Sequence, residues 1–358
     1  PWALKFVYAS NVDRYYSNRL GKRKSWIVPL LCVSWLLLPF LSLLSPADDL
    51  ALALGVIFVL NFLFATIDIA VDGYATDILK PGERPWGNTI QMVGYLLGYM
   101  MGAGLFLIVY QNLGWAQTVF LITALQLILM LPVILHKEIP PVSNNASPVD
   151  FEDNKKYKPS VWLLIKQAKA LWFLVFLIII AVFDQGGNQL RLPLLVDLGI
   201  NPQQLGHINI WIGTPISIAG AVLGGAFLRQ LGARKVYISA CLGAAAVSLA
   251  SALLSLSTSV SLWQAAALMG ADKLIIGVIT VLTCSMTMTM AVGTQSATNY
   301  AVLSSVGHLI GFMIMPVTGI ICDMVGYLSL YLTLAATGIL SIFIGNYLLI
   351  KRLHYSEM

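Results

Sequence analysis

The residues of this sequence that could do chemistry are acids and bases inside long apolar stretches. Asp68 and Asp72 lie four residues apart in the stretch 50–79, so on a helix they share one face. Neighbouring carboxylates repel each other, which favours the binding of a proton by one of them. We therefore predict a proton-exchanging pair. Asp77 falls on another face near the end of this stretch, where pairing with a basic loop is expected. Lys5 also lies in an apolar segment, where snorkelling to a polar interface is an equally open role.

Two further apolar stretches carry ionisable residues. Asp184, Asn188 and Arg191 recur at i, i+4 and i+7, which predicts a polar stripe on one helix face. Asp272 and Lys273 are adjacent, so on a helix they cannot point the same way. Because a charge at membrane depth is costly and by default marks function, we interpret these residues as the lining of a hydrated cavity. A structural ion pair remains the alternative for the stripe, and a purely structural role remains the alternative for Asp272 and Lys273.

The elements that must position these residues are apolar runs long enough to cross a membrane. Of 358 residues, 58% are hydrophobic and 10% are charged, whereas an ordinary soluble domain has roughly a quarter charged. The runs are continuous rather than alternating, which favours helices over a β-barrel. We predict an all-α polytopic membrane protein, with a partial helix at 1–10 and ten spans near 26–44, 50–79, 86–109, 115–135, 171–195, 205–228, 236–256, 262–290, 297–320 and 328–349.

The basic residues predict the orientation of these spans. If the loop 11–24 is cytoplasmic, that side holds 18 of the 21 Lys and Arg: five in 11–24, two in 80–85, six in 137–169, three in 229–235 and two in 351–358. The opposite loops hold none, as the positive-inside rule requires. We therefore predict that the linker and the C-terminus are cytoplasmic. The net charge of +5 then reflects topology, and no nucleic-acid partner is expected.

A polar stretch divides the chain into two halves. Residues 136–170 combine prolines with mixed charges, which predicts a solvated linker that ends in a short amphipathic helix. The predicted domains are an N-terminal half at 1–135, this linker, and a C-terminal half at 171–358. Six spans follow the linker, but four and a partial helix precede it. Symmetric six-helix halves would place helix 1 and part of helix 2 upstream, so we expect them to be missing from this chain.

Two of the basic loops contain related motifs. Residues 11–24 carry Asp13-Arg14 and then Gly21-Lys22-Arg23, and residues 225–235 occupy the corresponding place in the second half. Both resemble the signature of the major facilitator superfamily, which lies between its second and third helices and between its eighth and ninth. The resemblance implies loops in which an acid and bases pair across helix ends in one conformation and separate in the other.

The two motifs depart from the family pattern. Six residues separate Asp13-Arg14 from Gly21, where one is usual, and Arg229 stands where an acid is expected. The second loop is therefore expected to lack a lock built on an acid. The alternative for both loops is a simple positively charged anchor. The predicted lock residues are Asp13, Arg14, Gly21, Lys22, Arg23, Asp77, Gly232 and Arg234.

A more specific resemblance lies in residues 68–79, DIAVDGYATDIL, with the opening PWALKF at 1–6. These segments resemble the AmpG-like branch of the superfamily, which includes muropeptide permeases, RhtX/FptX-type siderophore importers and acetyl-CoA transporters. In the superfamily, helices 1, 4, 7 and 10 line the central cavity. With the missing helix restored, the spans that carry the predicted cavity residues are helices 4, 7 and 10. These residues are Asp68, Asp72, Asp184, Asn188, Arg191, Asp272 and Lys273.

The resemblance implies a secondary active transporter of the bacterial inner membrane that works by alternating access. The short C-terminal form and the run RLPLLVDLG at 191–199 resemble the siderophore importers, so we expect a proton-coupled importer of a siderophore-type solute. A muropeptide permease is the alternative, and a transporter-like sensor without flux is a third possibility.

An enzyme of the membrane would need a nucleophile and base or a ligand cluster. The sequence has no HExxH, GxSxG or paired histidine ligands, and its four cysteines lack metal-ligand spacing. We expect no enzyme activity, no cofactor and no metal. The expected partners are a small-molecule solute, the proton and the lipid bilayer, and we expect a monomer.

Overall fold

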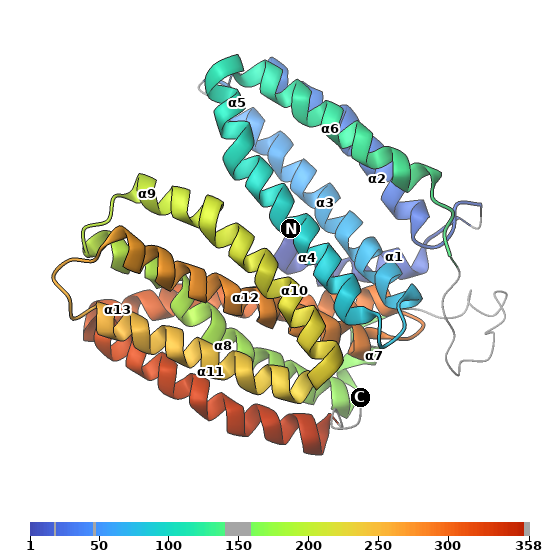
Figure 1. Cartoon of the computed structure of the whole chain (residues 1–358). Coiled ribbons are helices and arrows are strands. Elements are labelled where there is room, and N and C mark those ends of the chain that lie inside the picture. The colour runs from blue at the N-terminus through green and yellow to red at the C-terminus, as the bar shows by residue number, and fades with distance from the viewer. Residues whose placement is uncertain (18, 46–47, 140–158, 354–358) are drawn as a thin grey trace. The chain divides into compact units, whose positions relative to one another are not determined.

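The computed structural model describes residues 1–17, 19–45, 48–139 and 159–353, and these residues form helices joined by short connections (Figure 1). Their contacts define two compact units. Unit 1 contains Pro1–Pro81, Gly102–Ile165 and Thr287–Ser305, and unit 2 contains Gly82–Met101, Lys166–Met286 and Val306–Met358. Each unit therefore combines segments that are distant in the sequence.

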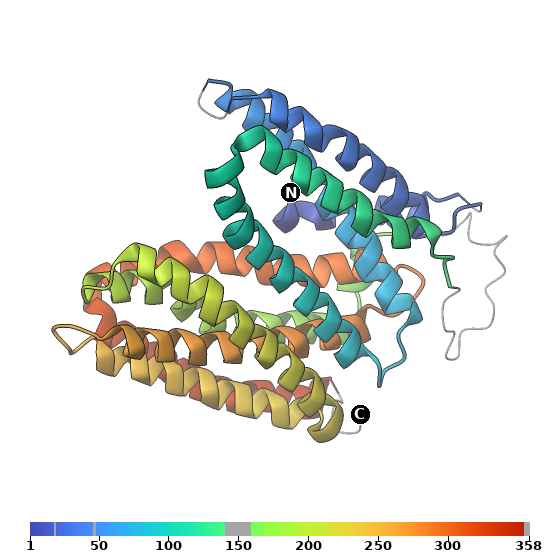
Figure 2. The same ribbon diagram turned by 45° about the horizontal axis from the view of Figure 1, so that its top comes forward.

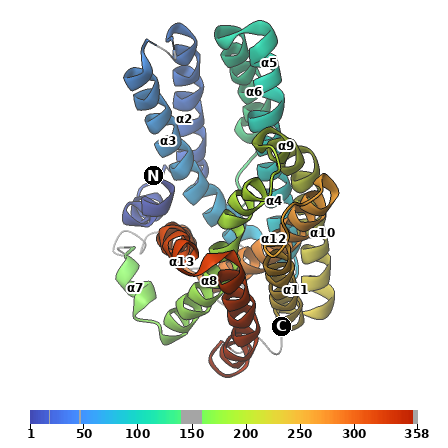
Figure 3. The same cartoon turned by 90° about the vertical axis from the view of Figure 1, so that its left-hand side faces the viewer.

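Unit 1 holds the helices that follow the N-terminus, together with the ends of two later helices. The bounds are η1 Trp2–Val7, α1 Ala9–Arg14, α2 Lys24–Leu37, η2 Leu38–Leu43, α3 Leu50–Ile78, α5 Phe106–Leu113, α6 Trp115–Leu135 and α7 Val161–Ile165. Helices α2 and α3 lie side by side (Figures 1 and 3). Gly114, with φ of 82°, separates α5 from α6, and a positive φ there favours glycine.

The core of unit 1 joins its N-terminal helices to the start of α13, which spans Ser296–Tyr347. Ala9 and Val12 of α1, Ile69 of α3 and Ala297 of α13 are all fully buried in one apolar cluster. Small side chains at two of these four positions, Ala9 and Ala297, let the helix backbones approach closely. The first turns of α13 are therefore a structural part of unit 1.

Unit 2 holds the remaining helices. Their bounds are α4 Arg84–Met100, α8 Ala168–Asp197, α9 Pro202–His207, η5 Ile208–Gly213, α10 Thr214–Leu231, α11 Ala233–Leu254, most of α12 Leu262–Ala291, the rest of α13, and η6 Leu348–Arg352. The π-type turn η3, Met101–Leu105, follows α4. Helix α10 packs along both α4 and α11 (Figure 2). A Cβ on Gly220 of α10 would overlap the backbone of Leu274 in α12, so glycine permits this close helix contact.

Nine helices in the described residues are long and apolar enough to cross a membrane. The last of them, Ser296–Arg352, contains two of the ten predicted spans. It breaks at Gly326, where φ is 77° and ψ is 166°, inside the loop predicted at 321–327. The ten predicted spans thus correspond to these helices to within about four residues, and the prediction of an all-α membrane fold is confirmed.

The predicted linker at 136–170 is described only at its two ends, because residues 140–158 lie outside the described residues. A short helix does occur near its end, α7. The division into halves at 1–135 and 171–358 and the upstream helices stay predictions. The residues 354–358 of the predicted cytoplasmic tail also lie outside the described part of the chain.

Candidate functional site

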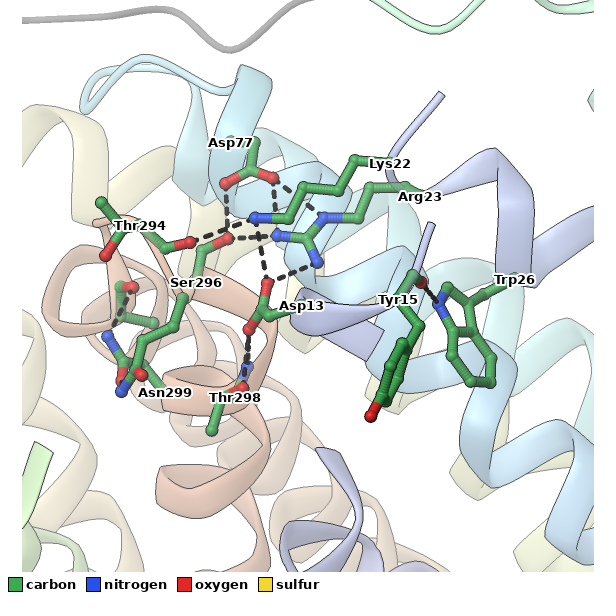
Figure 4. A network of polar contacts seen from close by, with 12 residues as sticks. Asp13, Tyr15, Lys22, Arg23, Trp26, Asp77, Thr294, Ser296, Thr298 and Asn299 are labelled. Carbon is green, nitrogen blue, oxygen red and sulfur yellow. Dashed lines mark hydrogen bonds and ion pairs between the residues drawn. The ribbon is translucent and has the colours of Figure 1, made fainter. Parts of the chain in front are cut away.

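The first site is a buried set of charges around Arg23, which we call the Arg23 network (Figure 4). The Arg23 guanidinium is 1% exposed and bonds two acids. Its Nη1 donates to Asp13 Oδ1 at 2.8 Å, and its Nε and Nη2 donate to Asp77 Oδ2 at 3.0 and 2.8 Å. Nη2 also donates to Ser296 Oγ at 2.6 Å, and that hydroxyl donates to Asp77 Oδ1 at 2.5 Å. One guanidinium thus joins α1, α3 and α13.

Asp13 links the Arg23 network to the start of α13. Its Oδ2 accepts bonds from the backbone N–H of Thr298 at 2.8 Å and from the Thr298 hydroxyl at 2.6 Å. The first backbone N–H groups of a helix lack partners within it and carry partial positive charge, so a carboxylate is favourable there. Lys22 Nζ lies 3.2 Å from Asp13 Oδ1. The acid therefore bridges the basic loop and the first turn of α13.

The neighbours of Asp13 and Arg23 keep both groups ionised. Burial alone would raise the pKa of Asp13, but the charges of Arg23 and Lys22 and the hydrogen bonds from Thr298 outweigh burial and hold that pKa below its ordinary value. Burial alone would lower the pKa of Arg23, but Asp77 and Asp13 outweigh it and raise that pKa. Asp13 and Arg23 therefore both carry full charges at neutral pH.

Two glycines make room for the Arg23 network. Gly21 turns the loop with φ of 100°, and a Cβ there would overlap the carboxylate of Glu138. Glu138 in turn accepts the backbone N–H groups of Arg23 at 3.1 Å and Lys24 at 2.8 Å, which satisfies donors at the start of α2. A Cβ on Gly73 of α3 would meet the Ala297 Cβ at 2.6 Å. Gly73 therefore sets how closely α3 and α13 approach.

Both described ends of the predicted linker bond beside the Arg23 network. At one end, Lys24 Nζ donates to the carbonyls of Ile134 at 2.5 Å and His136 at 2.6 Å. At the other end, Ser160 and Gln295 exchange two hydrogen bonds of 2.9 and 3.0 Å. Gln295 directly precedes α13. The two linker ends are thus bonded to the residue that follows Arg23 and to the residue that precedes Ser296.

The structure places the other predicted lock residues outside this network. Arg14 is exposed and lies over the ring of Tyr15, 5.1 Å from its centroid. Gly232 turns the chain between α10 and α11 with φ of 78°. Arg234 donates from Nε to Asn346 Oδ1 at 2.7 Å, an amide rather than an acid. The second loop therefore has a neutral partner where the first has carboxylates.

The second site is a triad in unit 1, formed by the buried Lys5 and Asp72 and the half-buried Asp68. Lys5 Nζ lies 2.6 Å from Asp68 Oδ2 and 3.7 Å from Asp72 Oδ2. The two acids sit one turn apart on α3, as their spacing predicts. Lys5 is 2% exposed and also lies 5.8 Å from the centre of the Trp2 ring. It is therefore an internal counter-ion in this structure and does not snorkel.

The third site is an ion pair in unit 2. Arg191 Nη1 of α8 donates to Asp272 Oδ1 of α12 at 2.5 Å, and both side chains are at least nine-tenths buried. Arg191 Nε also donates to Ser251 Oγ at 3.4 Å. Asp184 is not directly bonded to this pair among the described contacts; it accepts a 2.7 Å bond from Gln185 and lies within electrostatic range of Arg191, Asp272 and Lys273. The polar stripe of α8 is thus tied to another helix.

Lys273 points away from its neighbour Asp272, as adjacent helix positions require. Its side chain packs beside Gly213 of η5, where an added Cβ would lie 3.2 Å from Lys273 Cγ. Asn188 is half-buried on α8. Of the predicted residues in unit 2, only Arg191 and Asp272 are directly bonded to each other among the described contacts.

The sequence matches the Major Facilitator Superfamily over residues 12–312. The chain belongs to this superfamily. It is 24% identical over 340 residues to the anhydromuropeptide permease of Escherichia coli K12, which covers 94% of this chain and 68% of that protein. It is 25% identical over 362 residues to an uncharacterized protein of Haemophilus influenzae, covering 96% and 83% of the two chains.

Solved transporter structures show the same fold. The Escherichia coli fucose:proton symporter superimposes with a TM-score of 0.69 at 15% identity, covering 96% of this chain and 90% of that one. A bacterial homologue of the iron transporter ferroportin gives 0.63 at 11% identity, covering 99% and 87%. The superfamily and the fold are those of transporters, so this chain is a membrane-embedded transporter.

Residues of this superfamily member that sequence reasoning missed are Gly73, Glu138, Ser296 and Thr298. Gly73 lies in the segment 68–79 that carried the resemblance. A glycine inside a membrane helix is itself a signal of close contact with another helix. Ser296 and Thr298 have no such signal. They stand 273 and 285 residues from their partners Arg23 and Asp13, and short polar residues at a helix start are common caps.

Proposed function

We propose that this chain is a proton-coupled secondary transporter of the bacterial inner membrane that imports its solute by alternating access. The observation that carries the proposal is the triad of Lys5, Asp68 and Asp72, whose two acids lie on the membrane helix α3. Charges at membrane depth are rare and mark proton or substrate pathways, and well-packed apolar residues would stabilise a fold at least as well. A lysine bonded to two acids is suited to proton exchange because protonation of one acid changes its pairing.

The Arg23 network supplies the conformational part of the proposal. It holds the loop 11–24 and the end of α3 to the start of α13 in this conformation, and its bonds break and re-form as access alternates. The charged partners Asp13, Lys22, Arg23 and Asp77 are the lock. The loop of Gly232 and Arg234 acts as an anchor, because its described partner is neutral.

The Arg191–Asp272 pair is the proposed solute contact in unit 2. A planar guanidinium binds carboxylates bidentately, so an acidic solute can replace Asp272 as the partner of Arg191. Asp184, Asn188 and Lys273 are proposed as further cavity residues beside this pair.

Two solute classes fit this proposal, and both are acidic. The similarity to the anhydromuropeptide permease favours an anhydromuropeptide, whose peptide carries carboxylates. The run at 191–199, which contains Arg191, favours a siderophore-type solute. A competition experiment decides between them. Uptake of radiolabelled anhydromuropeptide is measured with and without excess ferric siderophore, and uptake of radiolabelled ferric siderophore is measured with and without excess anhydromuropeptide.

The test of the site uses purified protein in liposomes. Arg191→Ala and Asp72→Asn are each expected to abolish uptake of the solute that the wild type imports, whereas Arg14→Gln, which lies outside the network, is not. Full-rate uptake by a correctly folded Arg191→Ala or Asp72→Asn protein would refute the assignment of that residue to the transport site.

A further inference from the structure

The described contacts hold the Arg191 guanidinium at three points in unit 2. Its Nη1 donates to Asp272, and its Nε donates to Ser251 Oγ at 3.4 Å. Its Cζ lies over the ring of Tyr331, 5.9 Å from the ring centre. A cation within about 6 Å of an aromatic ring centre is attracted to the ring face. One of the three holders is thus an acid, and the other two are neutral.

Tyr331 is itself fixed in place by α8 and by a second tyrosine. It is fully buried, and its hydroxyl donates to the Gly187 carbonyl at 3.3 Å. Its ring stacks on that of Tyr327 with 6.5 Å between the ring centres, and the Tyr327 hydroxyl donates to Asp197 Oδ2 at 2.7 Å. Tyr331 is therefore bonded to α8 one turn before Arg191 and, through Tyr327, at the last residue of that helix.

A glycine lets the guanidinium and the ring pack against the same face of α8. A Cβ added to Gly187 would lie 3.2 Å from Arg191 Nη2 and 3.5 Å from Tyr331 Cε1. The first distance is shorter than ordinary van der Waals contact, so an alanine there would have to displace the guanidinium by a few tenths of an ångström. The lack of a side chain at position 187 is thus part of how Arg191 is placed.

An acidic solute that replaces Asp272 would remove the charged holder of Arg191. An arginine that is then free to change rotamer must be ordered again by the solute, which lowers affinity. Asp184 lies within electrostatic range of Arg191 but bonds Gln185, so it does not hold the guanidinium directly. A ring face attracts the guanidinium without accepting its N–H groups, so these donors stay available to a carboxylate.

We propose that Tyr331 is the positioning residue of Arg191 for an acidic solute. Its ring keeps the guanidinium in place while a solute carboxylate replaces Asp272, and Ser251 fixes the Nε end. The inference rests on the proposed solute contact at Arg191 and adds the residue that prepares this contact. Because Tyr331 is fully buried in this conformation, it acts through Arg191 and does not touch the solute.

The first test is equilibrium binding to the purified protein in detergent micelles. Radiolabelled anhydromuropeptide and ferric siderophore are each titrated, and the one that the wild type binds is used for the variants. Tyr331→Leu removes the ring face, so we expect its dissociation constant to rise about fivefold to thirtyfold. Tyr331→Phe keeps the ring and loses one hydrogen bond, so its constant should stay within about threefold of wild type. Tyr347→Leu, on the same helix but 51% exposed, is the matched control.

Two readouts separate positioning from a merely structural role. In liposomes, Tyr331→Leu should raise the solute concentration for half-maximal uptake by more than it lowers the maximal rate. Gly187→Ala should also weaken binding, because its Cβ displaces the guanidinium. Alanine favours a helix more than glycine does, so weaker binding by Gly187→Ala without a lower melting temperature would not be explained by unfolding.

A measurement without any solute tests the contact itself. Asp272→Asn removes the acid from Arg191, as replacement by a solute does. In that background, the lowering of the melting temperature by Tyr331→Leu is compared with and without Arg191→Gln. We expect a larger lowering when Arg191 is present, because only then does the ring lose a cation. Equal lowering would show that the ring does not hold the guanidinium, and it would overturn the proposal.

The outcomes separate this inference from the proposed function. If Arg191→Ala binds the solute as the wild type does, the proposed solute contact is wrong. If Arg191→Ala loses binding while Tyr331→Leu binds like the wild type, or while Tyr331→Phe is as weak as Tyr331→Leu, only the positioning role is wrong. If the wild type binds neither probe, both proposed solute classes are wrong, and the solute-free comparison decides whether Tyr331 holds Arg191.

Discussion

Replacing Asp13 by asparagine should loosen the start of α13. Asparagine keeps the shape of the side chain and one acceptor oxygen but removes the charge that faces Arg23 at 2.8 Å and Lys22 at 3.2 Å. Breaking a buried ion pair costs about 3–5 kcal/mol. Because Asp77 still bonds Arg23, we expect the lower end of this range.

The size of the effect follows from that free energy. A loss of about 3 kcal/mol changes the equilibrium between the closed and open network by about 100-fold, at about 1.4 kcal/mol for each tenfold. Ala301 of α13 is 1% exposed in the apolar core of unit 1. Its accessibility is a direct measure of how often the start of α13 separates from α1 and α3.

The assay is the rate of maleimide labelling of an Ala301→Cys protein in which the four native cysteines are replaced by serine. Asp13→Asn should increase that rate by up to about 100-fold, in proportion to the open population. Arg14→Gln is the matched control, since Arg14 is the exposed neighbour of Asp13. An unchanged labelling rate in a folded Asp13→Asn protein would refute the role of this acid in closing the network.

Three further results are expected. The folded-state pKa of Asp13 is lowered, so its stabilising effect is present above its unfolded value, about 3.9, and is lost only as the pH falls through the still lower folded value. The Ala301→Cys labelling rate, divided at each pH by the labelling rate of the same protein unfolded in denaturant to remove the pH dependence of the thiol itself, should therefore be constant between about pH 5 and 8, and a large change there would contradict this. Glu138→Ala should lower the free energy of unfolding by about 1 kcal/mol, the usual effect of losing a helix cap, in a thermal-melt comparison with Lys137→Ala. Arg191→Ala should leave Asp272 buried without this partner and lower that free energy by about 3–5 kcal/mol; a double variant with Asp272→Ala should recover part of it, and simple additivity would argue against their direct pairing.

The sequence predicts the spans well because membrane helices have a strong and local signal. It also predicts which acids share a helix face, since Asp68 and Asp72 are related by helix geometry alone. The expectation that Asp77 pairs with a basic loop is realised by its bonds to Arg23. In the first case the two residues are close in sequence. In the second case the order of the spans places the end of α3 and the basic loop on the same side of the membrane.

Local sequence patterns do not show which charged side chains pair with each other. Spacing shows that Asp184 and Arg191 lie on one face of a helix, but it does not show that Arg191 faces Asp272 from 81 residues away. Lys5 similarly pairs with Asp68, 63 residues later. Which helix packs against which face depends on tertiary packing, where small residues such as Gly73 decide how closely two backbones approach.

The central claim is that this protein moves a solute together with protons. The most direct test is to reconstitute purified protein in liposomes that contain a trapped fluorescent pH indicator, and then to add anhydromuropeptide or ferric siderophore outside. We predict acidification of the vesicle interior on addition of the transported solute, and no acidification with the Asp72→Asn protein. Solute uptake by the wild type without acidification would contradict proton coupling.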